Sequence, residues 1–180
     1  MKRILIPAAA GIVLATAAGC SSPSPSGAEA PSSAAPPPPR VAEILREGGL
    51  VAAGTGEAAN PQLALAKAKI DARKKLARSV RQKLDELASN FAKEAGDLPA
   101  PEIDRTFRAA ADQLAVEVLK KPMGFFRQYD EKEGGATVAR VLMMLDAERI
   151  EAALRYNAAP LLYERFQASK TFSKWRGGNK

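Results

Sequence analysis

Residues Leu50–Phe91 read LVAAGTGEAANPQLALAKAKIDARKKLARSVRQKLDELASNF, and this stretch decides the fold. The apolar run Leu50–Ala53 predicts a strand, bounded by the glycine segment Gly54-Thr55-Gly56. Asn60 is a good N-cap, and Pro61 suits the first position of a helix, so a long helix begins there. We therefore expect a strand and a helix joined by a tight junction that contains two glycines.

The long helix carries two kinds of apolar side chain. Ala64, Ala68 and Ala72 recur at intervals of four residues, so small side chains line the first half of the helix. Such a row lets a sheet approach closely. Larger side chains continue the apolar face, namely Leu65, Leu76, Val80, Leu84, Leu87 and Phe91. The second half of the helix therefore needs a partner helix or a wider gap.

The two glycines of the junction allow two interpretations. Gly54 and Gly56 follow a strand and precede a helix, as in dinucleotide-binding folds. The third glycine of that motif is replaced by Ala59, and no Gly-Lys-Ser/Thr sequence follows. We therefore expect the glycines to let the backbone turn, or to let it approach the helix closely, rather than to bind phosphate.

A second helix is predicted over Glu102–Leu119, and Pro122 ends it. Its apolar residues recur at helical spacing and are Ile103, Phe107, Ala110, Leu114 and Val118. A loop that contains Gly96 and Pro99 separates the two helices, so we expect them to pack as an antiparallel pair.

A hairpin and short helices complete the expected fold. Phe125–Tyr129 and Thr137–Leu145 flank the turn Gly134-Gly135, and the second strand becomes apolar on both faces, which is typical of a central strand. Asp146 can cap a helix over Ala147–Arg155, with Ile150 and Leu154 facing inward. Another amphipathic helix is predicted over Pro160–Phe172, with Leu162 and Phe166 on its apolar side. The fold class is α+β: a small antiparallel sheet of about three strands packs on the long helix and a second helix, with short C-terminal helices.

The N-terminal segment predicts export. Residues 1–20 combine Lys2 and Arg3 with an apolar run and small residues, which is typical of a signal peptide. Ala17-Ala18-Gly19-Cys20 is similar to a bacterial lipobox, although Ala17 stands where leucine is usual. Lipidation of Cys20, followed by sorting to the outer membrane, is the expected outcome. The alternatives are cleavage after Ala15-Thr16-Ala17 and a retained membrane anchor.

This interpretation divides the chain into four segments. Residues 1–20 are a lipoprotein signal peptide, and residues 21–40 are a disordered linker rich in proline and serine that cannot form a core. Residues 41–157 are the α+β domain. Residues 158–180 are an amphipathic, basic C-terminal tail.

The composition excludes several classes of chemistry. The 180 residues include no histidine and one cysteine, so a zinc site built on Cys and His, a disulfide within the chain and any mechanism with a histidine base are excluded. The formal charge of +7 lies mostly at the two ends, because residues 41–169 hold 20 basic and 19 acidic residues. This distribution and the export signal both disfavour nucleic acid as a partner. Asp130 with Glu131 is expected to be a pair of exposed loop charges, and Met143 and Met144 are expected in the core, so no catalytic residue, cofactor or metal is predicted.

Two basic surfaces are candidate contacts for an anionic polymer or a partner. The basic stripe of the long helix consists of Lys67, Lys74, Arg78 and Arg81, which fall opposite its apolar face. The aromatic-basic tail contains Lys170, Lys174, Trp175 and Arg176. The alternatives are a solvated helix surface for the stripe and a frayed, soluble end for the tail.

Some charges of the long helix need local partners. Asp71 is a plausible ion-pair partner for Lys67 and Lys75, one helical turn away on either side. Lys69 and Arg73 fall near the apolar side of the helix, where they either extend to its edge, pair with acids of a neighbouring element or contact another subunit.

The segment GTGEAANPQLALAKAKIDARKKLA and the later VARVLMMLD strand resemble the bacterial twenty-kilodalton outer-membrane lipoprotein family, the Lpp-twenty-like proteins. The shared pattern is a strand ending Gly-x-Gly and a helix rich in Ala-x-x-x-Ala-x-x-Asp-Ala-Arg. The matching positions are Gly54, Gly56, Ala68, Asp71, Ala72, Arg73 and Leu76. The likeness is weakest over the second helix.

This resemblance implies a small α+β domain tethered to the outer membrane and facing the periplasm. Members include lipoproteins of sheathed or polar flagella that assemble into rings or discs, and no catalytic residues carry over. The expected function is therefore a non-enzymatic lipoprotein with a structural or assembly role in the cell envelope, in a flagellar setting or another, and with self-association or envelope proteins as partners. The alternative is a binding module for an anionic envelope polymer such as peptidoglycan or lipopolysaccharide.

Overall fold

The structure is a computed structural model that describes residues 39–120, 125–132 and 134–177. The chain divides into two units, Met1–Ala35 and Pro36–Lys180, and all described residues belong to the second. The predicted signal peptide, Cys20 and Pro122 lie outside the described residues. The elements are α1 (Pro39–Arg46), β1 (Leu50–Ala58), α2 (Pro61–Glu94), α3 (Ala100–Lys120), β2 (Phe125–Glu131), β3 (Thr137–Leu145), α4 (Ala147–Asn157), α5 (Pro160–Gln167) and α6 (Lys170–Gly177).

The α+β class predicted from the sequence is confirmed. Three antiparallel strands form a sheet in the order β1-β3-β2, so β3 is the central strand, as its apolar character predicted. Alternate residues of β3 from Thr137 to Leu145 are buried beneath the sheet, and those between them are half-buried or exposed. The sheet therefore has one face packed against helices and one face that is more open.

Strand β1 is longer than the sequence predicted. It continues through Gly54 and Gly56, which pair with Val141 and Ala139 of β3 instead of forming a turn. A Cβ atom on Gly54 would lie 2.2 Å from the carbonyl oxygen of Ala68, and one on Gly56 would lie 2.3 Å from the carbonyl oxygen of Ala64. The glycines therefore serve close approach of strand and helix, the second of the two roles expected.

Helix α2 begins as predicted and presents its small side chains to the sheet. The side chain of Asn60 accepts hydrogen bonds from the backbone N–H groups of Gln62 and Leu63, at 2.8 and 3.3 Å. Ala64, Ala68 and Ala72 are fully buried, as the alanine row predicted. The glycines of β1 and the alanines of α2 together form the strand–helix junction.

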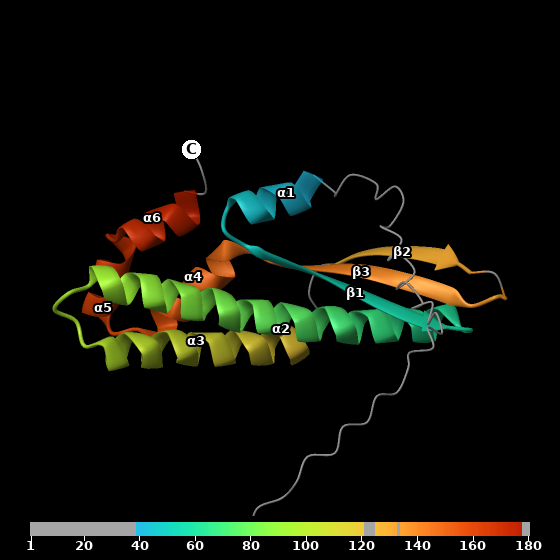
Figure 1. Cartoon of the computed structure of the whole chain (residues 1–180), viewed down its shortest axis with the longest axis horizontal. Helices are drawn as coiled ribbons and strands as arrows, with labels where there is room; N and C mark the ends of the chain where they lie inside the picture. The colour runs from blue at the N-terminus through green and yellow to red at the C-terminus, as the bar shows by residue number, and fades with distance from the viewer. Residues whose placement is uncertain (1–38, 121–124, 133, 178–180) are drawn as a thin grey trace, which may run out of the picture. The chain divides into compact units, whose positions relative to one another are not determined.

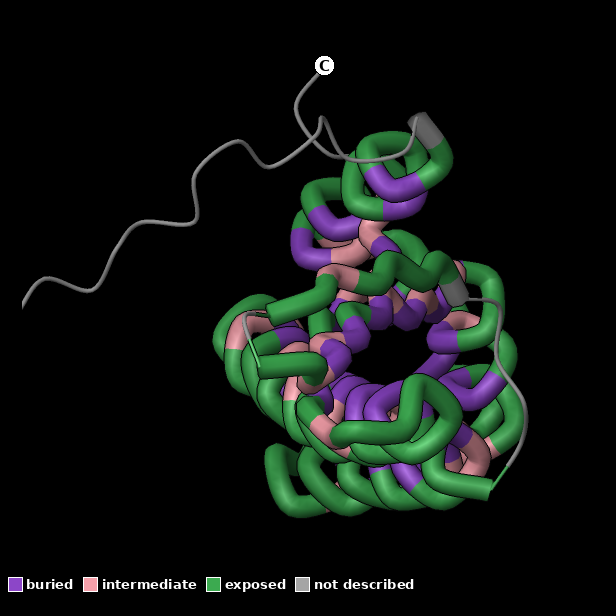
Figure 2. Tube along the Cα trace, turned by 90° about the vertical axis from the view of Figure 1, so that its right-hand side faces the viewer, coloured by how far each residue is buried: buried purple, intermediate pink, exposed green. Residues whose placement is uncertain are grey.

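Helix α2 is longer than the sheet that it supports. Its 34 residues span about 51 Å, whereas the nine residues of β1 span about 30 Å. Figure 1 shows the sheet over one half of α2, and α6 over the other half. Helix α3 packs antiparallel along α2, and Figure 2 shows that buried residues line the sides of the elements that face one another.

The segment predicted as an amphipathic, basic tail with one helix over Pro160–Phe172 contains two helices, α5 and α6, in its described part. Ser169 ends the preceding helix and caps the next one, because its hydroxyl oxygen accepts a hydrogen bond from the N–H of Phe172 at 3.0 Å. Phe166 of α5 packs edge-on against Phe91 and Phe107, with ring centroids 5.3 and 5.1 Å apart. Trp175 of α6 extends this aromatic cluster. The division at residue 157 therefore does not separate a domain from a tail.

The unit Pro36–Lys180 contains a complete hydrophobic core. Every residue of the described core cluster belongs to it, from Ala52 of β1 to Trp175 of α6. A unit with its own core can fold alone, so we expect this fragment to fold without residues 1–35.

Candidate functional site

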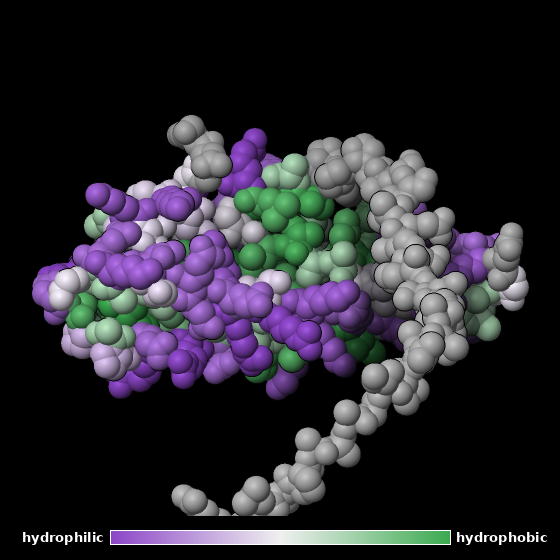
Figure 3. Space-filling view, in the orientation of Figure 1, coloured by the Kyte–Doolittle hydropathy of each residue, from purple (hydrophilic) through white to green (hydrophobic). Residues whose placement is uncertain are grey.

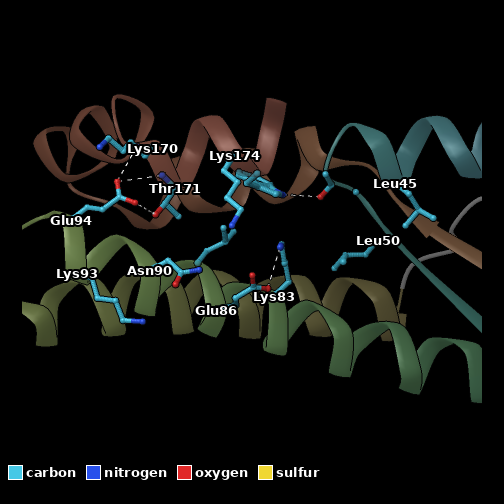
Figure 4. A pocket seen from close by; sticks show the side chains of 14 residues that line it. Leu45, Leu50, Lys83, Glu86, Asn90, Lys93, Glu94, Lys170, Thr171 and Lys174 are labelled. Carbon is cyan, nitrogen blue, oxygen red and sulfur yellow. Dashed lines mark hydrogen bonds and ion pairs between the residues drawn. The ribbon is translucent and has the colours of Figure 1, made fainter. Parts of the chain in front are cut away.

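The part of α2 that extends past the sheet forms one wall of an open groove of about 520 Å³. The other walls come from the end of α1, the start of β1, and α6 (Figure 4). We call this the basic groove, because its polar lining consists mainly of Lys83, Lys93, Lys170 and Lys174, with Glu86, Asn90 and Glu94. These segments are distant in sequence, so only the folded unit brings them together.

The α2 wall of the groove is polar because this part of the helix extends past the end of the sheet. Ser79, Lys83, Glu86 and Asn90 follow Ala72 by 7, 11, 14 and 18 residues, and these spacings keep to one helical face. The face that carries alanines under β1 thus carries polar side chains beyond it. Of these side chains, Lys83, Glu86 and Asn90 line the groove, because no strand covers them.

The opposite wall, α6, is held in place by two sets of hydrogen bonds. The indole N–H of Trp175 donates to the carbonyl oxygen of Gly48 at 2.8 Å, beside the start of β1. The carboxylate of Glu94 accepts the N–H of Lys170 at 2.9 Å, the N–H of Thr171 at 3.3 Å and the hydroxyl of Thr171. The hydroxyl bond from Thr171 is the main reason that the pKa of Glu94 lies below its ordinary value. This carboxylate is therefore already occupied at the N-terminus of α6.

Positive charge converges in the middle of the groove. Lys83 of α2 and Lys174 of α6 extend into the groove from opposite walls, and Asn90 lies on the α2 wall on the other side of Lys174 from Lys83 (Figure 4). Lys83, which is half-buried, forms an ion pair with the exposed Glu86 at 3.2 Å. Within the described part of the chain, no carboxylate oxygen lies within 4.0 Å of the ammonium nitrogen of Lys174. Lys83 thus has an acidic partner and Lys174 has none within this distance, and the four lysines of the lining exceed its two glutamates.

The groove also has an apolar end. Leu45 of α1 is 53 % exposed, and Leu50 at the start of β1 is half-buried. Figure 3 shows an apolar area beside α1 and the start of β1, next to the hydrophilic surface of α2. Leu87 and Trp175 are buried and form apolar parts of the lining. A ligand in the groove therefore meets lysines in the middle and leucines at one end.

The basic stripe predicted on α2 lies outside this groove, and two of its residues are engaged elsewhere. The ammonium of Lys67 donates to the carbonyl oxygen of Glu57 at 3.0 Å. The guanidinium of Arg81 pairs with Asp112 of α3 at 3.2 Å. Lys74 and Arg78 are exposed. The stripe is thus partly a set of internal contacts and does not line the basic groove.

Asp71 and Lys67 cap the free edge of β1. The carboxylate of Asp71 accepts the backbone N–H of Thr55 at 3.1 Å and the ammonium of Lys75 at 2.8 Å. The bond from Lys75, and then the bond from Thr55, lower the pKa of Asp71 below its ordinary value. The predicted pairing with Lys75 is confirmed, whereas Lys67 contacts the strand instead. Side chains of α2 therefore occupy edge groups that another strand would need.

The residues of the aromatic-basic tail have separate places in the fold. Trp175 is 5 % exposed and belongs to the core, so it does not offer an aromatic surface to a polymer. Arg176 donates to the carbonyl oxygen of Glu47 and pairs with Glu148, both at 3.1 Å, so it ties α6 to α4 and to the end of α1. Lys170 and Lys174 line the basic groove. Three of the eight predicted contact residues therefore line the groove, namely Lys170, Lys174 and the buried Trp175.

The residues predicted from the sequence do not include Lys83, Asn90 and Lys93, which line the groove. The signal was present, because the alanine face of α2 becomes polar after Ala72. A polar continuation of a buried face indicates that its covering element has ended. The position of α6 over this face of α2 was not predictable, since residues 158–180 had the pattern of an amphipathic, basic tail.

The described residues offer little for other chemistry. They contain no group of three or more Cys, Asp, Glu or His placed to hold a metal ion. Asp130 lies on β2 and pairs with Arg140 at 3.3 Å, and Glu131 is exposed. Met143 is buried, as predicted, whereas Met144 is half-buried on the more open face of the sheet. Among the helices of the described part, none has the length and apolarity required to cross a bilayer.

Comparison with protein-family models, with curated proteins and with solved structures finds no match to this chain.

Proposed function

We propose that this chain is a lipid-anchored envelope protein whose folded unit binds an anionic envelope molecule in the basic groove. The observation that carries the proposal is the excess of lysines over glutamates in the lining of the groove, where Lys83 and Lys174 extend inward from opposite walls. Lysine is a compact, strongly hydrated charge, so such pairs are stabilised when an anion lies between them.

The anchor and the location are part of the same proposal. Lipidation at Cys20, attachment to the outer membrane and a domain without catalytic activity follow from the lipobox and from the resemblance to the Lpp-twenty-like proteins. We expect Cys20→Ser to abolish incorporation of radiolabelled palmitate and to move the protein from the membrane fraction to the soluble fraction. Retention of Cys20→Ser in the membrane fraction would support an uncleaved apolar anchor instead.

Binding can be tested with the Pro36–Lys180 unit, purified peptidoglycan sacculi and vesicles of lipopolysaccharide. We expect the unit to co-sediment with at least one of them at low salt. Lys83→Gln with Lys174→Gln removes two charges from the groove and should weaken binding at least about tenfold. The matched control is Lys74→Gln with Arg78→Gln, which removes two exposed charges of the stripe. Equal binding by both double variants would show that the groove is not the site.

A second candidate function is an assembly role through the open face of the sheet. Phe126 of β2 is 47 % exposed and pairs with half-buried Leu142 of β3, while half-buried Met144 lies on the same face. An apolar sheet face of this kind favours contact with another protein surface. Light scattering after size-exclusion chromatography tests it: we expect an oligomer that Phe126→Ser dissociates. A monomer at high concentration would argue against assembly through this face.

A further inference from the structure

We infer that the basic groove takes a phosphorylated amphiphile, with a phosphomonoester between Lys83 and Lys174 and an apolar chain over Leu45 and Leu50. The inference rests on the proposed function, because it names the chemical class of the anion that the groove binds. It depends on two features of the groove that lie side by side: the charged middle and the apolar end.

The charged middle favours a phosphate over a carboxylate. Two ammonium groups extend into the groove from opposite walls, those of Lys83 and Lys174, and the carboxamide of Asn90 lies on the α2 wall beyond Lys174 (Figure 4). A phosphomonoester carries about −1.5 to −2 charges and three acceptor oxygens, so one group can bind both lysines. A single carboxylate carries half of that charge and two oxygens.

The acidic residues of the groove do not prevent this binding. The carboxylate of Glu94 is held by the N-terminus of α6 and by the hydroxyl of Thr171, at the far end of the groove from Leu45. Glu86 pairs with Lys83 on the surface, and its side chain is 59 % exposed. The Lys83 side chain is 26 % exposed, so the pair is partly exposed, and a doubly charged ligand offers Lys83 a stronger electrostatic partner than one carboxylate does.

The apolar end favours an amphiphile over a bare phosphate or a sugar polymer. Leu45 is 53 % exposed in a position that borders the lysines, and Leu50 continues the same surface. Inorganic phosphate would leave these leucines in water, whereas an acyl chain attached to the phosphate would cover them. The volume of about 520 Å³ is within the range typical of sites for compact ligands.

The test uses the sole tryptophan of the chain, Trp175, as a fluorescence reporter inside the groove lining. The Pro36–Lys180 unit is titrated with three probes: dihexanoyl phosphatidic acid below its micelle concentration, dihexanoyl phosphatidylcholine and sodium phosphate. We expect phosphatidic acid to bind at least about tenfold more tightly than sodium phosphate, because only the former covers the leucines. We expect phosphatidylcholine, whose phosphate is a diester that bears a choline, to bind more weakly than phosphatidic acid.

Two pairs of variants locate the two halves of the ligand. Lys83→Gln with Lys174→Gln should weaken phosphatidic acid at least about tenfold, while Lys74→Gln with Arg78→Gln leaves it unchanged. Leu45→Ser should weaken phosphatidic acid about fivefold and leave sodium phosphate unchanged. Leu161→Ser is the matched control, since Leu161 is 60 % exposed on α5 and does not line the groove. Circular dichroism establishes that each variant is folded.

The outcomes separate this inference from the proposed function. If phosphatidic acid and sodium phosphate bind equally, or if Leu45→Ser behaves like Leu161→Ser, the amphiphile is wrong and anion binding stands. If sacculi bind through Lys83 and Lys174 and no phosphate probe does, the phosphate is wrong and the groove remains a polymer site. If neither sacculi, lipopolysaccharide nor any probe depends on the two lysines, both proposals fail.

Discussion

Replacing Gly54 by alanine adds one methyl group at the closest approach between β1 and α2. The new Cβ atom would lie 2.2 Å from the carbonyl oxygen of Ala68, 2.3 Å from the amide nitrogen of Ala72 and 2.7 Å from the Cβ atom of Ala72. Ordinary van der Waals contact begins at 3.4 Å. The first two neighbours are backbone atoms in the interior of a helix, so they cannot rotate away and α2 must move from the sheet.

The expected cost follows from two opposing effects. Overfilling a packed core typically destabilises by about 1–3 kcal/mol, and a rigid backbone neighbour places this site at the upper end. Alanine also restricts the unfolded chain, which stabilises by about 0.4–1 kcal/mol. We therefore expect the free energy of unfolding to fall by about 2 kcal/mol, which for a unit of this size lowers the melting temperature by about 6 °C.

Thermal and urea unfolding of the Pro36–Lys180 unit, followed by circular dichroism, measure this difference. Gly177→Ala is the matched control, because a Cβ atom there meets nothing within 4 Å, and we expect it to be neutral or slightly stabilising. Adding Ala72→Gly to Gly54→Ala should restore little, since it removes only one of the three close contacts. A Gly54→Ala protein as stable as Gly177→Ala would refute close packing as the reason for the glycine.

Three further changes test how the C-terminal helices are held. Trp175→Phe removes the donor to the carbonyl oxygen of Gly48 and should lower the free energy of unfolding in urea by about 1–2 kcal/mol; an unchanged midpoint would mean that this bond contributes nothing. The pKa of Glu94 lies below its ordinary value of 4.5, chiefly because of the hydroxyl of Thr171, so folding favours the carboxylate. The contribution of the Glu94 carboxylate to stability is complete above pH 4.5 and is lost as the pH falls through the lowered pKa. Between neutral pH and about pH 3, Glu94→Gln should therefore lose less free energy of unfolding than the wild type. Parallel plots of this free energy against pH for the two proteins would contradict the expectation. Burial, followed by the hydrogen bond to Glu151, raises the pKa of Tyr163 to about 12. The contribution of the neutral phenol to stability is therefore complete below pH 10 and is lost as the pH rises toward 12. Tyrosinate absorbance, with the other two tyrosines replaced by phenylalanine, should show this late ionisation, and an ordinary titration near 10 would contradict it.

The basic groove also predicts how salt affects the protein. A ligand held by Lys83 and Lys174 at an open surface is screened by ions, so its affinity should fall as the ionic strength rises. The apolar contribution of Leu45 does not weaken in the same way. The difference between Leu45→Ser and the wild type should therefore persist at high salt, when the difference caused by the lysine variants has become smaller.

The long helix and the central strand were predictable from local pattern. Asn60 and Pro61 marked the start of α2, and the period of Ala64, Ala68 and Ala72 marked the side that a sheet covers. The apolar run in Thr137–Leu145 marked the central strand. Each of these features depends on neighbours within one or two turns, which is the range over which a sequence pattern acts.

The length of β1 and the fate of the C-terminus were not predictable in this way. Glycine usually weakens a strand, so Gly54 and Gly56 read as its end. In the fold they are compatible with a strand because the alanines of α2 lie directly against them. The segment that contains Trp175 read as a basic tail, yet a carbonyl group at Gly48, 127 positions earlier, and the aromatic core hold it in place.

The sequence by itself predicted the fold class, the contact between strand and helix, and a lipid-anchored envelope protein. Each of these predictions depends on residues that lie close together along the chain. Only the tertiary structure decided where the positive charge is concentrated. The stripe of α2 looked continuous on a helical wheel, but Lys67 and Arg81 are engaged by β1 and α3. The groove forms because α2 extends past the sheet and α6 packs over the face of α2 that the sheet leaves uncovered. A periodic pattern relates only residues that are close in sequence, so it could not predict contact between these distant segments.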